Sequence, residues 1–353
     1  MSNPTMTITS TTSGVTDGST TNDATIALTF TSSLATSDFT WDGTSGDIVV
    51  TNGSLSALSG SETTYTATFT PTGQGACTID VNAGVFTADV GGQSNSAATT
   101  FNWTFDSVAP GAFTTGAVTA VGGTVVASYW NSTNTSLTIG VPIANDSTLT
   151  DGTLQLRVKV GSGSYVDLDS AYTILSGDLN STITRSVSAA VLEAISGVTN
   201  GVTLTFNTIL KDKANNTTTG TASGTTIAVD QTLPGITIAS STSGVTSGST
   251  TNDGSIVLTF ATGESTTNFA RSDITVSAGT LGATLNGSGS SYNITFTPAG
   301  DTTYTVNVAA NAYTDAAGNG NTVATQFSWT YDGTDPGAFT TGAVTAVGGT
   351  VVA

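Results

Sequence analysis

The chain repeats itself, and this repetition constrains its fold more than any other feature. The stretch PGAFTTGAVTAVGGTVVA occurs at residues 110–127 and again, identical at every position, at residues 336–353. A second pair, TSGVTDGSTTNDATIALTF at 12–30 and TSGVTSGSTTNDGSIVLTF at 242–260, is offset by 230 residues. Large repeats at a fixed period are typical of arrays of stacked units. We therefore expect segments in the order A, B, A′ and the start of B′.

A recurring Asp-x-x-x-Pro pattern predicts the boundaries between these segments. It occurs at residues 106–110, 230–234 and 332–336, each time after a run that reads as a last strand. Proline restricts φ and stiffens such a junction. We expect segment A at 1–107, segment B at 108–231, segment A′ at 232–333 and a truncated B′ at 334–353. The chain is then a fragment of a longer A-B array, and we expect its tail, Gly337–Ala353, to be poorly packed.

Apolar residues alternate with polar ones along short runs, as they do in half-buried strands. Ile26, Leu28 and Phe30 form one such run in segment A, and Leu154–Val160 forms another in segment B. Loops rich in Gly and Asn separate the runs. About seven short strands in roughly 100 residues predict an all-β fold of tandem immunoglobulin-like β-sandwiches in a linear array, with a truncated terminal repeat. The one helical candidate is Ser188–Gly197, which starts with Ser and stops at Gly.

Charge and composition exclude several classes of protein. The net charge is −18, from 24 acidic and 6 basic residues, so neither nucleic acid nor an anionic membrane is an expected partner. The chain has no His and one Cys, which excludes a disulfide framework and a Cys/His zinc site. The start, MSNPTMTITS, lacks the basic and apolar regions of a signal peptide. No apolar run is long enough for a membrane helix, so we expect no membrane insertion.

The sequence offers no catalytic residues and no cofactor-binding residues that we can assign. A triad needs a His, and no Gly-x-Ser-x-Gly motif or phosphate-binding loop is present. Spacing alone leaves a pair of acids for glycoside hydrolysis open. The candidate acids, however, lie in repeated loops, which indicates a repeated structural role. We expect that the chain is not an enzyme.

One loop motif resembles a known family. YTDAAGNGN at 313–321 precedes a final strand and then YDGTDP, and LKDKANN at 210–216 is a weaker version. In segment A the loop has drifted to FTADVGGQSN at 86–95. These features resemble the bacterial Ig-like tandem repeats of large surface adhesins. The resemblance implies an extracellular or cell-surface spacer that presents a distal adhesive region. It also implies neighbouring repeats as partners, a host or surface glycan or protein as ligand, and calcium between domains.

Strand direction in a seven-stranded sandwich gives an independent reason to expect calcium. The first loop of one segment, the linker and the second and sixth loops of the next segment should meet at each junction. Ca²⁺ prefers six to eight oxygen ligands, and clustered carboxylates repel one another without a cation. The candidate ligands are Asp23, Asp106, Asp146, Asp151 and Asp212 at the A/B junction, Asp230 and Asp315, with Asn319, at B/A′, and Asp253, Asp332 and Asp335 at A′/B′. The alternative is that these Asp side chains only cap turns.

Two tryptophans leave a ligand-binding function open. Trp41 lies in an insertion peculiar to segment A, and Trp130 lies in an early loop of segment B, so either could be exposed and bind a glycan or protein. Trp103 and Trp329 occupy inward-facing strand positions and are expected in the core. Cys77 aligns with Tyr304, which favours a buried thiol over a catalytic one. A phage fibre or virion decoration protein is a further setting for such repeats.

Overall fold

The computed structural model describes residues 2–343 of the chain. Residues 344–353, which belong to the expected start of B′, lie outside the described residues. The described part is nearly all β-structure, which confirms the predicted fold class. Its residues group into two compact units, Met1–Val121 with Thr135–Val229, and Gly122–Asn134 with the residues from Asp230 onward. The proposed domain boundaries near Asp106 and Asp230 stay a prediction.

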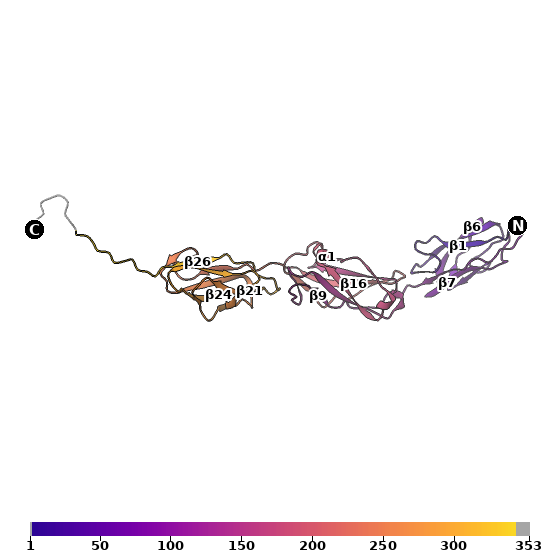
Figure 1. Ribbon diagram of the computed structural model, residues 1–353. Helices are drawn as coiled ribbons and strands as arrows, with labels where there is room; N and C mark the ends of the chain where they lie inside the picture. Colours follow the sequence, from indigo (N-terminus) through magenta and orange to yellow (C-terminus); the bar gives the residue numbers. More distant parts are fainter. Residues whose placement is uncertain (1, 344–353) are drawn as a thin grey trace, which may run out of the picture. The chain divides into compact units, whose positions relative to one another are not determined.

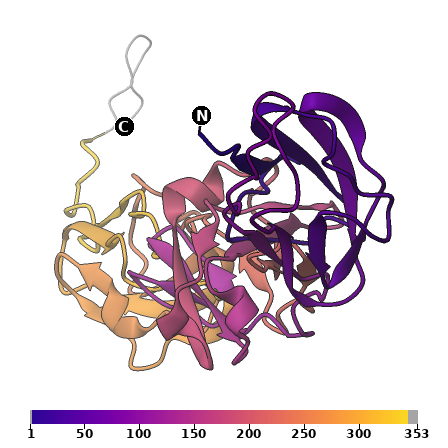
Figure 2. The ribbon, with the colours of Figure 1, turned by 90° about the vertical axis from the view of Figure 1, so that its right-hand side faces the viewer.

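Segment A consists of two four-stranded sheets, whose strands are coloured indigo to purple in Figure 2. The first sheet has the order β1 (Met6–Ser10), β3 (Ile26–Thr36), β6 (Ser59–Pro71) and β5 (Gly53–Leu55). The second has the order β2 (Ser19–Thr21), β8 (Phe101–Phe105), β7 (Gly75–Val81) and β4 (Ile48–Thr51). β2 pairs with β8 in parallel, and the other strand pairs of these two sheets are antiparallel.

Segment A′ repeats this topology strand for strand. One sheet has the order β19 (Thr237–Ser240), β21 (Ile256–Thr266), β24 (Asn286–Thr297) and β23 (Thr280–Leu281). The other has the order β20 (Thr250–Thr251), β26 (Phe327–Tyr331), β25 (Thr302–Val308) and β22 (Ile274–Val276). A 3-10 turn, η3 (Arg271–Asp273), takes the place of the longer loop of segment A.

Segment B has a different arrangement of two sheets, one of which contains β9 and the other β16, both labelled in Figure 1. One sheet has the order β15 (Ser181–Ser188), β11 (Ser136–Ile143) and β9 (Val118–Val121). The other contains β18 (Ile227–Val229), β16 (Thr203–Lys211), β12 (Thr153–Val160) and β13 (Tyr165–Asp167), with β14 (Tyr172–Thr173) on β12 and β17 (Thr217–Thr219) on β16. The remaining elements are β10 (Tyr129–Trp130), η1 (Ser147–Leu149), η2 (Ser176–Asp178) and α1 (Ala189–Glu193).

The predicted helix is confirmed in a shorter form. The side chain of Ser188 caps α1 by accepting a hydrogen bond from the backbone N–H of Val191. The helix ends at Glu193, before the Gly197 that the sequence suggested as its stop. Gly197 has φ of +86°, a conformation that favours glycine.

Alternating apolar residues fill the cores, as the strand periodicity predicted. Trp103 and Trp329 are both 1% exposed and pack against Phe69 and Phe296 respectively. Cys77 is also fully buried in the core of segment A, and this burial raises the pKa of its thiol. A buried, protonated thiol is a poor nucleophile, so the interpretation of Cys77 as a core residue is confirmed.

The described part of the tail, residues 334–343, contains no strand. Phe339 is 86% exposed there. Its counterpart in segment B, Phe113, lies so close to Gly220 that a Cβ added to the glycine would be 2.5 Å from the ring. The phenylalanine of this repeated stretch therefore packs against Gly220 in segment B, as Phe113, and is open to solvent in the tail, as Phe339.

Candidate functional site

The Asp-Ala-Ala-Gly-Asn loop of segment A′ is closed by hydrogen bonds between its first and last residues. The backbone N–H of Asn319 donates to Asp315 Oδ1 over 2.9 Å, and its side-chain amide donates to Asp315 Oδ2 over 2.9 Å. The same amide donates to the carbonyl oxygen of Asp230 over 2.9 Å. Asn319 is fully buried. We call this arrangement, in which an Asn joins the Asp of its loop to a linker carbonyl, the asparagine clasp.

Segment B contains a second asparagine clasp. Asn216 donates from its backbone to Asp212 Oδ1 over 2.8 Å, and from its amide to Asp212 Oδ2 over 3.0 Å and to the carbonyl of Asp106 over 2.8 Å. The residue before each clasp Asn has positive φ, +75° at Asn215 and +89° at Gly318. Asn and Gly adopt this conformation at the lowest cost, so the two loops close in the same way despite different sequences.

Three carboxylates meet beside the clasp of segment A′. Candidate ligand atoms of Asp230, Glu264 and Asp315 all lie within 4.8 Å of one another. Burial raises the pKa of Glu264 most, and the negative charges of Asp230 and Asp315 raise it further. Like charges this close disfavour one another's ionised form unless a proton or a cation is present. Among residues 2–343, this is the one set of three acidic or thiol ligands at metal-binding spacing.

Glu264 was missed by sequence reasoning, which placed only Asp230, Asp315 and Asn319 at this junction. It lies on β21, where the pairing register with β24 shifts between Ala261 and Thr266. Comparing segments A and A′ position by position would have pointed to Glu264. Leu34 occupies the position of Glu264 in segment A, and Ala88 occupies the position of Asp315. The two carboxylates are thus both present in one repeat and both absent in the other.

The candidate ligands of the A/B junction converge only in part. Asp212 is 1% exposed, and its pKa is raised first by burial and also by the charge of Asp106. Asp146 instead caps η1 by accepting from Thr148 N over 2.9 Å. Asp151 forms an ion pair with Lys213 at 3.2 Å, and Asp23 accepts a hydrogen bond from the Thr21 hydroxyl. These three residues make turn or ion-pair contacts, and metal binding by them stays a prediction.

The three candidates of the A′/B′ junction also make local contacts. Asp253 accepts from the Thr251 hydroxyl over 2.6 Å, and Asp332 accepts from the backbone N–H of Thr334 over 3.3 Å. Asp335 is exposed. The remaining residues of the expected B′ strand lie beyond the described part of the chain. Metal binding by this set stays a prediction.

The tryptophans differ from one another in exposure. Trp130 is 0% exposed, so the expectation that it forms an exposed ligand platform is wrong. Trp41 is partly buried and donates its indole N–H to the carbonyl of Leu55 over 3.2 Å. In segment A′, Arg271 donates to the corresponding carbonyl of Leu281 over 3.3 Å. Trp41 therefore has a structural contact that Arg271 reproduces, while its ring remains in part accessible.

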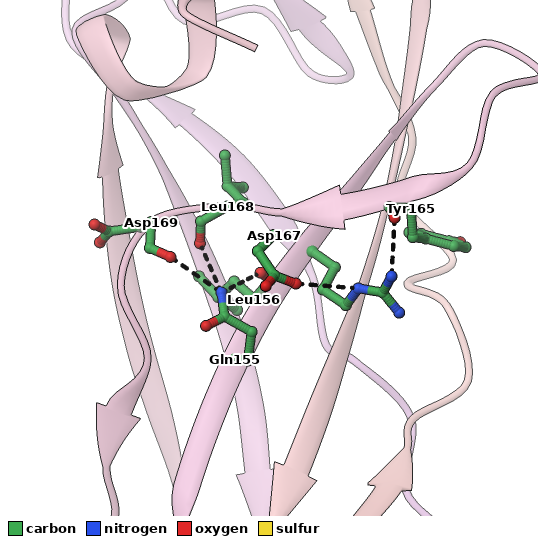
Figure 3. A network of polar contacts seen from close by, with 7 residues as sticks. Gln155, Leu156, Tyr165, Asp167, Leu168 and Asp169 are labelled. Carbon is green, nitrogen blue, oxygen red and sulfur yellow. Dashed lines mark hydrogen bonds and ion pairs between the residues drawn. The ribbon is translucent and has the colours of Figure 1, made fainter. Parts of the chain in front are cut away.

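Five of the six basic residues lie in segment B, where most make local contacts. The guanidinium of Arg157 donates to the carbonyl of Tyr165 over 2.8 Å and lies 3.4 Å from Asp167 Oδ1; Figure 3 labels these two partners. The amide of Gln155, in the same network, donates to the carbonyls of Leu156 and Asp169. These contacts join β12 to β13 and to the loop after it. We assign them to the stability of the sheet.

Comparisons with known proteins place most of the chain in one family. A family model described as a bacterial Ig-like domain matches residues 1–106 and 230–331. No curated protein matches the chain. In the described residues, no helix has the length and apolar character that crossing a membrane requires.

Several solved structures are similar at low identity. A structure described in connection with host cell surface retention of a 1.5-MDa bacterial ice-binding adhesin has 14% identity and a TM-score of 0.31, covering 94% of this chain and 98% of that chain. Invasin, a bacterial integrin-binding protein, has 14% identity and a TM-score of 0.29, with 87% and 56% covered. The Yersinia pseudotuberculosis adhesin InvE has 14% identity and a TM-score of 0.22, with 65% and 60% covered. Similarity at this level carries no argument about what the chain binds.

Proposed function

Because the chain belongs to the bacterial Ig-like domain family, we propose that it is a structural spacer of a bacterial cell-surface or secreted adhesin, stiffened by calcium. In this role it presents a distal adhesive region and catalyses no reaction. The observation that carries the proposal is the repeated asparagine clasp. A spacer needs junctions that resist bending, and a clasp bonds each linker to the segment that follows it.

The calcium part of the proposal rests on the chemistry of Asp230, Glu264 and Asp315, which we call the acidic set. Carboxylate oxygens are the hard ligands that Ca²⁺ prefers, and Asp230, Glu264 and Asp315 bring three such groups together. Burial raises the pKa of Glu264 most, and the charges of Asp230 and Asp315 raise it further; a bound cation would offset this second effect. These three residues would bind the ion, and the ion would supply the missing positive charge. Asp106 and Asp212 form a second, smaller pair of candidate ligands.

Small-angle scattering and thermal unfolding test both parts of the proposal. At fixed ionic strength, we expect the chain to melt at a higher temperature in Ca²⁺ than in chelator. We also expect small-angle scattering to show a narrower range of particle dimensions in Ca²⁺ than in chelator. Ligand at 100 times its dissociation constant stabilises the folded state by about 2.7 kcal/mol. Unchanged melting and dimensions would exclude the calcium site. A chain that samples compact, folded-back arrangements even with saturating Ca²⁺ would exclude a spacer.

A matched pair of variants separates site binding from general charge effects. Glu264→Leu copies Leu34 of segment A and should remove most of the calcium response. Asp167→Asn removes one negative charge at a position where the side chain is 68% exposed and pairs with Arg157, and it should leave the response intact. Equal responses from both variants would place any calcium effect outside the proposed set.

A further inference from the structure

Segments A and A′ share a surface hollow whose chemistry differs between the two. In segment A it measures about 330 Å³ and is lined by Phe39, Trp41, Asp42 and Tyr65, among others. In segment A′ the hollow at the corresponding place, beside Phe269 and Tyr292, measures about 430 Å³. The shared fold therefore creates the hollow, while the loop peculiar to segment A adds a tryptophan and a carboxylate to its wall.

The hollow of segment A lies in a negative electrostatic field. Asp42 lines it and is ionised at neutral pH, because hydrogen bonds from Ser45 and Thr44 lower its pKa to about 2. The pKa of Tyr65 is raised first by burial and then by the charges of Asp89, Asp38 and Glu62. Segment A contains nine acidic residues and no Lys or Arg to offset them.

Three of these acids, Asp38, Glu62 and Asp89, have uncharged counterparts in segment A′. Asn268 replaces Asp38 and accepts the same hydrogen bond from the threonine two residues earlier. Gly289 replaces Glu62 opposite the same strand position, and both have positive φ. Ala316 replaces Asp89, and the loop that contains Trp41 and Asp42 is shorter in segment A′. The hollow of segment A′ keeps its two aromatic residues, but no charged side chain is among the described residues that line it.

We propose that the hollow of segment A binds a quaternary ammonium group. An aromatic wall attracts a cation through the negative face of its rings, and Trp is the strongest of the three aromatic side chains in this role. The carboxylate of Asp42 in the wall adds charge complementarity. A trimethylammonium group is the best occupant because it carries a positive charge without the strong hydration of a lysine ammonium. A volume of about 330 Å³ is large enough for such a head group. This inference does not depend on the spacer or calcium proposals.

Titration of the full chain with choline tests the site, with sodium chloride exchanged for choline chloride at constant ionic strength. Trp103, Trp130 and Trp329 are at most 1% exposed, so changes in tryptophan fluorescence report mainly on Trp41. We expect a saturable change. The neutral analogue of the same shape, 3,3-dimethylbutan-1-ol, should bind at least about tenfold more weakly. Equal binding of the two compounds, or no saturable change with choline, would overturn the proposal.

Two variants replace residues of segment A by the residues that segment A′ has at the same positions. Trp41→Arg should abolish the choline response, and the double variant Asp38→Asn with Glu62→Gly should weaken it several-fold. The double variant keeps the test valid if Trp41→Arg fails to fold, since Asn268 and Gly289 occupy these positions in the folded repeat. Asp167→Asn with Asp169→Asn changes the net charge equally, at two residues of segment B that pair with Arg157 and Arg185, and should have no effect. A double variant that binds choline as well as the parent chain would refute the site.

A lysine derivative tests the alternative that the hollow binds the ammonium group of a lysine side chain. N-acetyl-lysine methylamide should bind more weakly than choline because its ammonium is more strongly hydrated. If it binds more tightly, the hollow recognises a protein side chain and the assignment to a quaternary ammonium group is wrong.

Discussion

The side-chain amide of Asn319 lies 2.9 Å from the main-chain carbonyl oxygen of Asp230, 89 residues earlier in the chain. The same bond recurs between Asn216 and Asp106 at 2.8 Å. In both clasps the Asn also bonds both carboxylate oxygens of an Asp four residues before it. In each clasp, a single side-chain amide thus bonds the Asp of its loop and also holds the carbonyl at the start of the segment.

Replacing the clasp residue should destabilise segment A′. Asn319→Ala removes the side-chain amide that donates to Asp315 Oδ2 and to the Asp230 carbonyl, while the backbone N–H still donates to Asp315 Oδ1. Buried groups left unpaired cost about 1–3 kcal/mol each. Hydrogen exchange of the slowest amides in β24 and β25 measures this loss. The control Asn293→Ala changes an exposed side chain on β24 and should stay within about 0.5 kcal/mol of the parent. Equal exchange in the two variants would show that the clasp adds nothing to stability.

The acidic set should give the chain a defined pH dependence. An acid whose pKa is higher in the folded state binds its proton more tightly there, so stability falls as pH rises. For Glu264 the free energy of unfolding begins to fall near pH 4.5, the ordinary pKa of this side chain, and stops falling once the pH passes the raised pKa of the folded state. Above that pH the loss of stability remains. In chelator, Glu264→Gln should therefore melt at a higher temperature than the parent at about pH 7, and at nearly the same temperature at about pH 3.5. A lower melting temperature of the Gln variant at neutral pH would contradict this assignment.

The two core tryptophans should respond differently to the same substitution. Trp329 donates its indole N–H to the Thr251 hydroxyl over 3.0 Å, whereas no described atom accepts the buried N–H of Trp103. Trp→Phe therefore breaks a hydrogen bond at one position and removes an unpaired donor at the other. We expect Trp329→Phe to cost about 1 kcal/mol more than Trp103→Phe. Local hydrogen exchange at β26 and β8 checks the difference, and the reverse order would be inconsistent with these contacts.

Limited proteolysis tests the segment boundaries. The residues that follow Asp106 and Asp230, such as Val108 and Leu233, are exposed. Proteases cut first where the backbone is accessible and can open locally. We expect early fragments that end near these two residues or within the tail after Asp332. Mass spectrometry identifies the ends. First cuts inside the strands of A, B or A′ would mean that the boundaries are wrong.

Repetition and periodicity were enough to predict the fold class. Two copies of one pattern must fold alike, and alternating residues such as Ile26, Leu28 and Phe30 can bury one face only as strands. The burial of Cys77 and Trp103 followed from their position in this pattern. Local signals of this kind are carried by neighbours in sequence, so they are readable without coordinates.

The composition of the acidic set depended on the tertiary structure. Asp230 and Asp315 could be predicted to meet from strand direction, but Glu264 comes from an irregular stretch of β21, and no local pattern indicates which way a side chain points there. The contacts of Asp146 with Thr148 and of Asp151 with Lys213 were likewise not predictable from strand direction, and metal binding by these residues stays a prediction.

The sequence by itself determined that this chain is an array of β-sandwiches, because period and alternation are properties of consecutive residues. Only the tertiary structure decided which long-range contacts form, such as the clasp of Asn319 on Asp230 and the burial of Trp130. These contacts join residues that lie far apart in the chain, and their geometry depends on how loops of different length close over the sheets. The physical reason is that burial and hydrogen bonding of such groups are set by the whole fold rather than by the local sequence.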